Sequence, residues 1–338
     1  MELNIIWFIL IAVLLTGYAI LDGFDLGVGF VSFFAKSDTD KRILLNSIAP
    51  VWDGNEVWLL TGGGALFAAF PEVYASVFSG FYTALILVLA LLIFRATAIE
   101  FRSKVESPKW RSFFDNLFSL SSTIAALLFP VALGNVAYGV MLEGNKEITN
   151  SFLSLLNPYS LIVGLTGLSL IILHGFNYAL YRTEGELYKL LNGKYNLFYY
   201  IYLVLFLILN IVTLFTQKHL LKNYNDYPVF YLLPIINLIF ILLMMKYHKS
   251  GLNFRAFMMS AVSILLNMIT FAIGMFPNFV NSLINPEYNL NIYNSASSQK
   301  TLGIMLIIAL IGMPLVIAYT TVIYRVFRGK TKLDEHSY

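Results

Sequence analysis

Two carboxylic acids, Asp53 and Glu56, stand three residues apart in the largely apolar stretch PVWDGNEVWLL. A second pair with the same spacing, Asp22 and Asp25, lies in GYAILDGFDLGVG. Residues three apart share one face of an α-helix, so we expect each pair to point in one direction. Arg95 lies in another apolar stretch. Four acids near one arginine could form an ion pair, a proton relay or both.

The composition indicates which elements must position these charges. The chain has 338 residues, of which 58% are hydrophobic and 12% charged, with a mean hydropathy of +0.74. Soluble domains typically carry about 25% charged residues, so this composition indicates a polytopic membrane protein. The absence of cysteine excludes disulfides, thiolate-ligated haem and iron–sulfur clusters in this chain. The net charge of +3 is too small to suggest a nucleic-acid partner.

A bilayer core is crossed by roughly 20 apolar residues in a helix, and nine stretches of the sequence meet or approach that length. The second is the least regular, because Pro50 and the glycine run after it could bend or break a helix. We expect an all-α polytopic membrane protein with nine transmembrane helices in a single integral-membrane domain, 1–338. The nine stretches are Ile5–Phe34, Ile43–Phe70, Ala75–Ile99, Leu117–Met141, Pro158–Leu180, Asn196–Phe215, Val229–Met245, Phe254–Phe276 and Leu302–Ile323.

The basic residues of the connections predict the orientation in the membrane. With nine spans, seventeen lysines and arginines fall on the side that receives Lys41, and only four fall on the other side. Cytoplasmic loops carry the excess of basic residues. We therefore expect the N-terminus outside and the C-terminus in the cytoplasm. An eight-span arrangement would scramble this partition.

This arrangement brings the charges of the first three spans to similar depths. At about 1.5 Å per residue, Asp25 and Asp53 each lie about 15 Å from the inner face, provided that the second span stays helical. Asp22 and Glu56 are three residues from them on the same spans, and Arg95 of the third span is somewhat nearer the inner face. If Arg95 pairs with one acid, the pair locks helices together. The acids left over at membrane depth suit a protonatable path that leads inward from the cytoplasm.

Histidine and glycine give weaker signals. Of the four histidines, His174 is the one that lies well within a span. It could ligate a haem or a metal ion, but we favour a hydrogen bond to a neighbouring helix, because no second ligand is obviously paired with it. Gly23, Gly27 and Gly29 form no dinucleotide fingerprint, and we expect them to permit close packing of membrane helices.

The motifs GYAILDGFDLGVG, KRILLNSIAPVWDGNEVWLL, GGALFAAFPEVYA and FRATAIEFRSK follow one another in the first third of the chain. In this order they closely resemble subunit II of the cytochrome bd family of quinol oxidases, and weaker similarity continues through GMFP and SASSQKTL. The resemblance implies two four-helix bundles plus one peripheral helix, in a bacterial or archaeal cytoplasmic membrane. It also implies a heterodimer with a subunit I that carries haems b558, b595 and d, whereas this chain holds no cofactor.

The implied reaction of the complex is oxidation of quinol with reduction of dioxygen to water, which generates a proton gradient. By resemblance, Asp25, Asp53 and Arg95 belong to a cytoplasmic proton path toward the haems, and spacing adds Asp22 and Glu56. Two other readings stay open. One is a proton-coupled transporter without a redox partner, which the lack of a clear inverted repeat disfavours. The other is a purely structural subunit. The sequence leaves open the choice of ubiquinol or menaquinol and any small accessory subunits.

Overall fold

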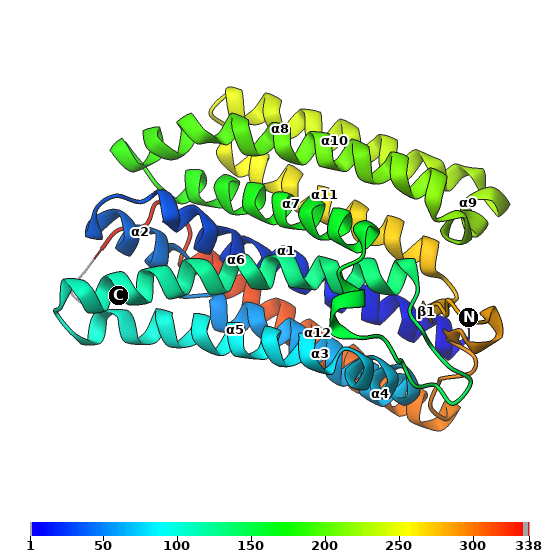
Figure 1. Cartoon of the computed structure of the whole chain (residues 1–338). Helices are drawn as coiled ribbons and strands as arrows, with labels where there is room; N and C mark the ends of the chain where they lie inside the picture. Colours follow the sequence, from blue (N-terminus) through cyan, green and yellow to red (C-terminus); the bar gives the residue numbers. More distant parts are fainter. Residues whose placement is uncertain (1, 334–336, 338) are drawn as a thin grey trace.

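The computed structural model describes residues 2–333 and 337, and most of them lie in long helices that run side by side through an elongated molecule (Figure 1). The α-helices are α1 (Leu3–Val31), α2 (Asp38–Ile48), α3 (Trp52–Ala69), α4 (Pro71–Gly80), α5 (Tyr82–Phe101), α6 (Pro108–Tyr138), α7 (Pro158–Arg182), α8 (Gly185–Thr216), α9 (Lys222–Asp226), α10 (Leu232–Lys249), α11 (Asn253–Met275) and α12 (Gln299–Val326). Short 3-10 turns lie at Ser32–Phe34, Arg102–Lys104, Phe152–Leu155, Lys218–Leu221, Pro228–Tyr231 and Pro286–Tyr288.

Within the described part of the chain, eight helices are long and apolar enough to cross a membrane by length and composition. They are α1, α5, α6, α7, α8, α10, α11 and α12. The prediction of a helical polytopic membrane protein is therefore confirmed. The connection after α11 adds one small antiparallel pair of strands, β1 (Asn278–Val280) and β2 (Leu290–Asn291), which the sequence did not indicate.

The second predicted span, Ile43–Phe70, is broken at the proline. Helix α2 ends at Ile48 and α3 begins at Trp52, with Pro50 between them. Proline lacks an N–H group and its ring clashes with the preceding turn of a helix, so the chain cannot continue straight. The remaining helix, α3, does not meet the criteria of length and composition for a membrane span, because three polar residues fall in its first turns.

The third predicted span, Ala75–Ile99, is wrong at its start. Helix α4 ends at Gly80, and α5 begins at Tyr82. Serine and glycine are weak helix formers and often mark kinks, and here they directly precede the break. Gly80 also lets Ile148 approach, since a Cβ added at this glycine would lie 2.4 Å from the Ile148 Cβ.

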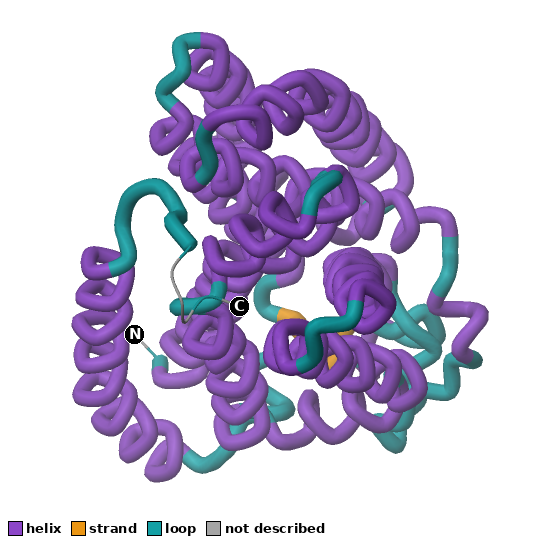
Figure 2. Tube along the Cα trace, turned by 90° about the vertical axis from the view of Figure 1, so that its left-hand side faces the viewer, coloured by secondary structure: helices purple, strands orange, loops and turns teal. Residues whose placement is uncertain are grey.

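Helix α1 occupies the centre of the packing. It contacts α3, α6, α7 and α11, while α5 packs on α6, α8 on α7 and α10 on α11. Figure 1 places α8 and α10 along one long edge of the molecule and α3, α4 and α12 along the opposite edge. The end-on view of Figure 2 shows the last helix, α12, standing at the margin of the bundle, and most of its side chains are exposed.

Glycine allows α1 to touch its neighbours. A Cβ at Gly27 would lie 2.7 Å from the Cα of Gly175 in α7, and a Cβ at Gly29 would lie 2.3 Å from Ser122 in α6. Any larger residue would push these helices apart. The prediction that glycines of α1 permit close packing is therefore confirmed.

Candidate functional site

A buried ion cluster joins α1 to α5. Arg95 donates two hydrogen bonds to Asp22, from Nη1 to Oδ2 at 2.8 Å and from Nη2 to Oδ1 at 2.5 Å. The same Nη2 lies 4.0 Å from Oδ2 of Asp25. All three side chains are buried. A buried charge is tolerated when it is paired, and the two-pronged guanidinium–carboxylate contact is the strongest pairing geometry. Asp22 is thus the counter-ion of Arg95.

Asp25 lies beside Arg95 but receives no hydrogen bond from it. Its Oδ2 accepts a hydrogen bond from Nδ2 of Asn55 at 2.8 Å. Its Oδ1 has no hydrogen-bond partner among the residues that the structure describes. The carboxyl group therefore has one fixed oxygen and one free oxygen beside a cation that is already paired. Such a group is chemically suited to take up and release a proton.

Two residues that sequence reasoning missed hold Asp25 in place. Asn55 donates a second hydrogen bond from Nδ2 to the carbonyl oxygen of Leu21 at 3.1 Å, and Tyr324 of α12 donates from its hydroxyl to Oδ1 of Asn55 at 2.9 Å. The amino group of the amide thus faces two acceptors and its oxygen faces a donor, which fixes its orientation. For Tyr324 the sequence offered no signal, because only the fold brings the last helix beside the first.

A signal for Asn55 was available in α3. The buried residues of this helix are Trp52, Asn55, Gly62 and Ala69, at the spacing of one helical face that packs on α1. Asp53 is two positions before Asn55, about 200° away around a helix with 3.6 residues per turn, and its side chain is exposed.

The structure therefore brings together only part of the predicted cluster. Asp22, Asp25 and Arg95 meet as expected. Glu56 is half-buried and lies within electrostatic reach of Arg95. Asp53 lies apart, on the outer face of α3. The reason is the break at Pro50, because the new helix takes its register from its small residues against α1 and not from the acid pair.

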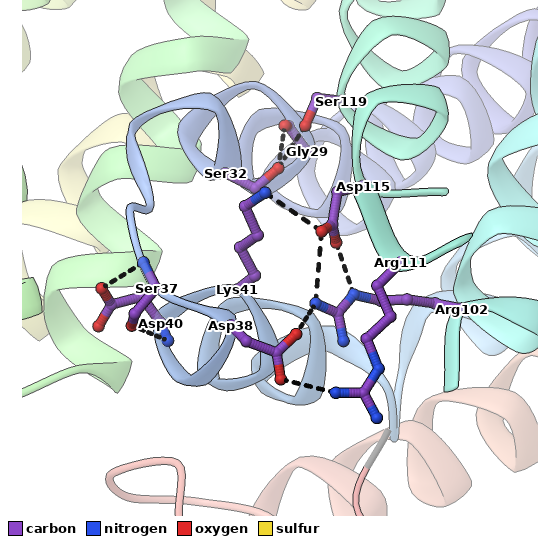
Figure 3. A network of polar contacts seen from close by, with 10 residues as sticks. All are labelled: Gly29, Ser32, Ser37, Asp38, Asp40, Lys41, Arg102, Arg111, Asp115 and Ser119. Carbon is purple, nitrogen blue, oxygen red and sulfur yellow. Dashed lines mark hydrogen bonds and ion pairs between the residues drawn. The ribbon is translucent and has the colours of Figure 1, made fainter. Parts of the chain in front are cut away.

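A second polar network lies at the end of the molecule that holds α2 and the C-terminus (Figures 1 and 3). Arg102, which is 2% exposed, donates from Nε to Asp115 at 2.5 Å and from Nη2 to Asp38 at 2.7 Å. Lys41 pairs with Asp115 and Arg111 with Asp38, each at 3.2 Å. In the sequence analysis these basic residues contributed only to the charge bias that predicts the orientation in the membrane. In the structure they fasten α2 to the end of α5 and the start of α6.

The charge state of this network follows from its contacts. Partial burial disfavours the ionised form of Asp38, but the hydrogen bond and charge of Arg102 outweigh burial and lower the pKa of the Asp38 carboxyl. The charge of Arg111 acts in the same direction. Asp38 is therefore ionised at neutral pH, and it holds the two arginines together at this end of the bundle.

His174 is bonded to two neighbouring helices. Its Nδ1 lies 2.7 Å from the hydroxyl of Ser260 in α11, and its Nε2 lies 3.0 Å from the carbonyl oxygen of Ile20 in α1. The predicted hydrogen bond to a neighbouring helix is confirmed. With both ring nitrogens engaged, this imidazole fits a packing role better than haem ligation. Within residues 2–333 and 337, no three or more histidine, aspartate or glutamate side chains are grouped as a metal site.

Comparison with known proteins gives consistent results over nearly the whole chain. Residues 3–327 match the family described as cytochrome bd terminal oxidase subunit II. The cytochrome bd-I ubiquinol oxidase subunit 2 of Escherichia coli strain K12 is 35% identical, with 98% of this chain and 96% of that protein covered. The cytochrome bd ubiquinol oxidase subunit 2 of Bacillus subtilis is 32% identical, with 99% and 98% covered.

The fold has a counterpart among solved structures. The bd oxidase of Geobacillus thermodenitrificans contains a chain that matches with a TM-score of 0.80, at 17% identity, over 97% of this chain and 99% of that one. At this identity the match shows a shared fold and nothing more specific. Together with the family match over residues 3–327, it leads to one conclusion: the chain belongs to the cytochrome bd terminal oxidase subunit II family.

Proposed function

We propose that this chain is the second subunit of a bd-type quinol oxidase, in which it forms a heterodimer with a haem-bearing subunit I. The complex oxidises quinol and reduces dioxygen to water in the respiratory chain of a bacterial cytoplasmic membrane. The names of the Escherichia coli and Bacillus subtilis relatives, both ubiquinol oxidase subunits, support this activity. Haems b558, b595 and d are assigned to the partner, which supplies the redox chemistry.

The role proposed for this subunit is to stabilise the complex and to supply part of a cytoplasmic proton path. The observation that carries the proposal is the buried carboxyl group of Asp25, beside an arginine that Asp22 already neutralises. Reduction of dioxygen to water consumes protons, and a buried carboxyl group that changes its protonation can deliver them. In this proposal Asp53 and Glu56 extend the path along α3, and the exposed side chain of Asp53 would exchange a proton with the partner subunit.

The proposed arrangement in the membrane has nine spans in one domain, 1–338, with the N-terminus outside and the C-terminus in the cytoplasm. Helix α3 would be the ninth span, because its 18 residues extend over about 27 Å, close to the roughly 30 Å of a bilayer core. The helix contacts support one bundle of α1, α3, α5 and α6 and another of α7, α8, α10 and α11, with α12 peripheral. The bias of basic residues toward one side supports the orientation.

The proposal is tested in the assembled complex with Asp25→Asn and Asp53→Asn. Asparagine keeps the size and much of the hydrogen bonding of aspartate but cannot carry a proton. We expect both variants to keep the haems of the partner and to lose most quinol-dependent oxygen uptake, measured per haem from a difference spectrum. Glutamate at either position should restore part of the rate. Asp226→Asn, at an exposed acid in α9, is the control and should keep full turnover.

Each alternative predicts a different outcome. Full turnover in Asp25→Asn would refute the proton path. Loss of turnover together with loss of haem would favour a purely structural subunit. If the chain purified without a haem-bearing partner and supported proton-coupled transport by itself, the chain would be a proton-coupled transporter and not an oxidase subunit.

A further inference from the structure

We propose that protons reach Asp25 along a line of serine hydroxyl groups in the contact between α1 and α6. The line, referred to below as the serine seam, consists of Ser32, Ser119 and Ser122. It begins at the polar network of Figure 3 and ends at the buried ion cluster. The proposal rests on the proposed role of Asp25 as a proton carrier and specifies the route by which this residue is supplied.

The two helices place the residues of the seam in matching order. Residues at intervals of three and four share one face of a helix. On α1 such a face holds Asp25 and Gly29, and it continues into Ser32, the first residue of the 3-10 turn that follows α1. On α6 it holds Asp115, Ser119 and Ser122. The helices run in opposite directions, so Ser32 meets Ser119 and, one turn deeper, Gly29 meets Ser122.

The contacts within the seam are close. The hydroxyl oxygens of Ser32 and Ser119 are 2.5 Å apart, and Ser32 donates to the carbonyl oxygen of Gly29 at 2.7 Å (Figure 3). A Cβ added at Gly29 would lie 2.3 Å from Oγ of Ser122, so this hydroxyl rests directly on the backbone of α1. Glycine at this position is therefore what allows the Ser122 hydroxyl to sit one helical turn from Asp25.

The polar atoms at the two ends of the last step of the route are unsatisfied. Oγ of Ser122 and Oδ1 of Asp25 have no hydrogen-bond partner in the described part of the chain. Both residues are 0% exposed. Leaving such an atom unpaired destabilises the folded state, and native proteins keep few of them. Gly29, which Ser122 contacts, is one turn of α1 from Asp25, about 6 Å along the helix axis. A bridging group between Ser122 and Asp25 would satisfy both atoms.

Exposure is highest at the network and lowest at Ser122 and Asp25, with Ser32 at 8% between them. The side chain of Asp38 is 45% exposed and that of Asp115 is 13% exposed. Ser119 is 2% exposed, and Ser122 and Asp25 are fully buried. The network of Figure 3 is thus the end of the route that meets water.

A hydroxyl group can accept a proton at its oxygen while it releases its own. A proton from water at the network passes to the Ser119–Ser32 pair. Because Oγ of Ser122 has no hydrogen-bond partner in the described part of the chain, a bridging water molecule carries the proton from this pair to Ser122. On each oxygen one O–H bond forms as another breaks, so every serine ends unchanged. The last step requires a second bridging water molecule, between Ser122 and Asp25. The proton ends on Oδ1 of Asp25, because Oδ2 is held by Asn55.

Small hydroxyl residues also serve simply to pack membrane helices, so the test must separate the hydroxyl group from the packing. Threonine and valine have the same shape and differ in the hydroxyl group. We therefore compare Ser122→Thr with Ser122→Val in the assembled complex. Ser121→Ala is the control, because Ser121 is 1% exposed on the same helix and its hydroxyl donates to Leu117 instead, at 2.6 Å.

The measurements are oxygen uptake per haem at saturating quinol, the KM for quinol and the solvent deuterium isotope effect. We expect turnover of Ser122→Val to be at least about tenfold below that of Ser122→Thr, since positioned proton-transfer groups contribute 10²–10⁴-fold. KM should stay unchanged and the isotope effect should increase in the valine variant. Adding Ser122→Val to Asp25→Asn should cause no further loss.

The outcomes separate the two proposals. Equal turnover of the valine and threonine variants, with Asp25→Asn inactive, would overturn the serine seam and leave the role of Asp25 standing. Full turnover in Asp25→Asn would overturn both. If neither variant at Ser122 assembles, the same pair of substitutions at Ser119 decides, because the route needs both hydroxyl groups.

Discussion

Replacing Asp22 by asparagine should leave the complex assembled but stop its turnover, although Asp22 itself is not the proposed proton carrier. Asp22 neutralises Arg95 through two hydrogen bonds. When one partner of a buried ion pair is removed, the charge left behind typically costs about 3–5 kcal/mol. In this cluster a substitute is at hand, because Asp25 Oδ2 lies 4.0 Å from Nη2 of Arg95.

The gain from this substitution can be estimated. At an effective dielectric constant of about 20, two unit charges attract by about 4 kcal/mol at 4 Å and by about 6 kcal/mol at hydrogen-bond distance. Closing the gap to Asp25 therefore returns about 2 kcal/mol of the 3–5 kcal/mol lost. The net cost of Asp22→Asn is about 1–3 kcal/mol. Asp25 then becomes the permanent counter-ion of Arg95 and can no longer release and take up protons.

The assay compares three variants of the assembled complex: Asp22→Asn, Asp25→Asn and the double variant. Thermal midpoints are read from the loss of the haem spectrum in detergent, and oxygen uptake is measured per haem. Both single variants should assemble and lose turnover. The double variant leaves Arg95 without a neighbouring carboxylate in α1, so its midpoint should fall well below those of the single variants. Each kcal/mol corresponds to about 2–4 °C for a domain of 150–250 residues.

Two results would refute this reasoning. A double variant as stable as Asp22→Asn would mean that Asp25 does not replace the lost counter-ion. Full turnover in Asp22→Asn would mean that the protonation of Asp25 does not depend on which acid Arg95 binds.

Three further predictions concern other parts of the chain. His174→Ala should leave the haem spectrum of the complex intact, because both ring nitrogens are bonded within this chain; loss of a haem band would identify a ligand instead. A single cysteine at Ser103 should be shielded from an impermeant thiol reagent in intact cells and one at Glu143 should react, whereas the opposite pattern would invert the proposed orientation. The lowered pKa of Asp38 stabilises its contacts at pH values above the ordinary carboxyl range, and this contribution is lost as pH falls through the lowered value. Amide hydrogen exchange in α2, corrected for its intrinsic rate, should therefore rise in acid, and Asp38→Asn should abolish the change.

The sequence allowed the ion cluster to be predicted because one helix face carries it. Asp22 and Asp25 are three residues apart on α1, and an arginine at membrane depth requires a counter-ion. To predict the cluster from these two facts, it is enough to assume that α1 and α5 are neighbours. The choice of Asp22 as the bonded partner could not be predicted, because both acids are equally near in sequence, and only the geometry of the guanidinium group separates them.

The acids of α3 show where spacing alone misleads. Asp53 and Glu56 share a face, as their spacing requires, but spacing does not tell which face meets α1. That choice depends on packing. Gly62 allows a close approach to Leu14 and Leu15 of α1, and Asn55 and Ala69 are buried on the same side of the helix. A polar residue at the spacing of the small residues was therefore the better indicator of the buried face.

The same reasoning explains why the serine seam could not be found before the fold was known. The positions of Asp22, Asp25 and Gly29 on α1, continued by Ser32 directly after it, already define one polar face. A proton route along this face also needs polar side chains from a second helix. Serines are too common in apolar helices for the sequence to identify which helix supplies them. The serines that complete the route can be identified only from the contact between Gly29 and Ser122. This contact fixes the register of α6 on α1 and therefore which serines of α6 face α1. The absence of a side chain at Gly29 thus determines which hydroxyl group lies nearest to the carboxyl group that must be protonated.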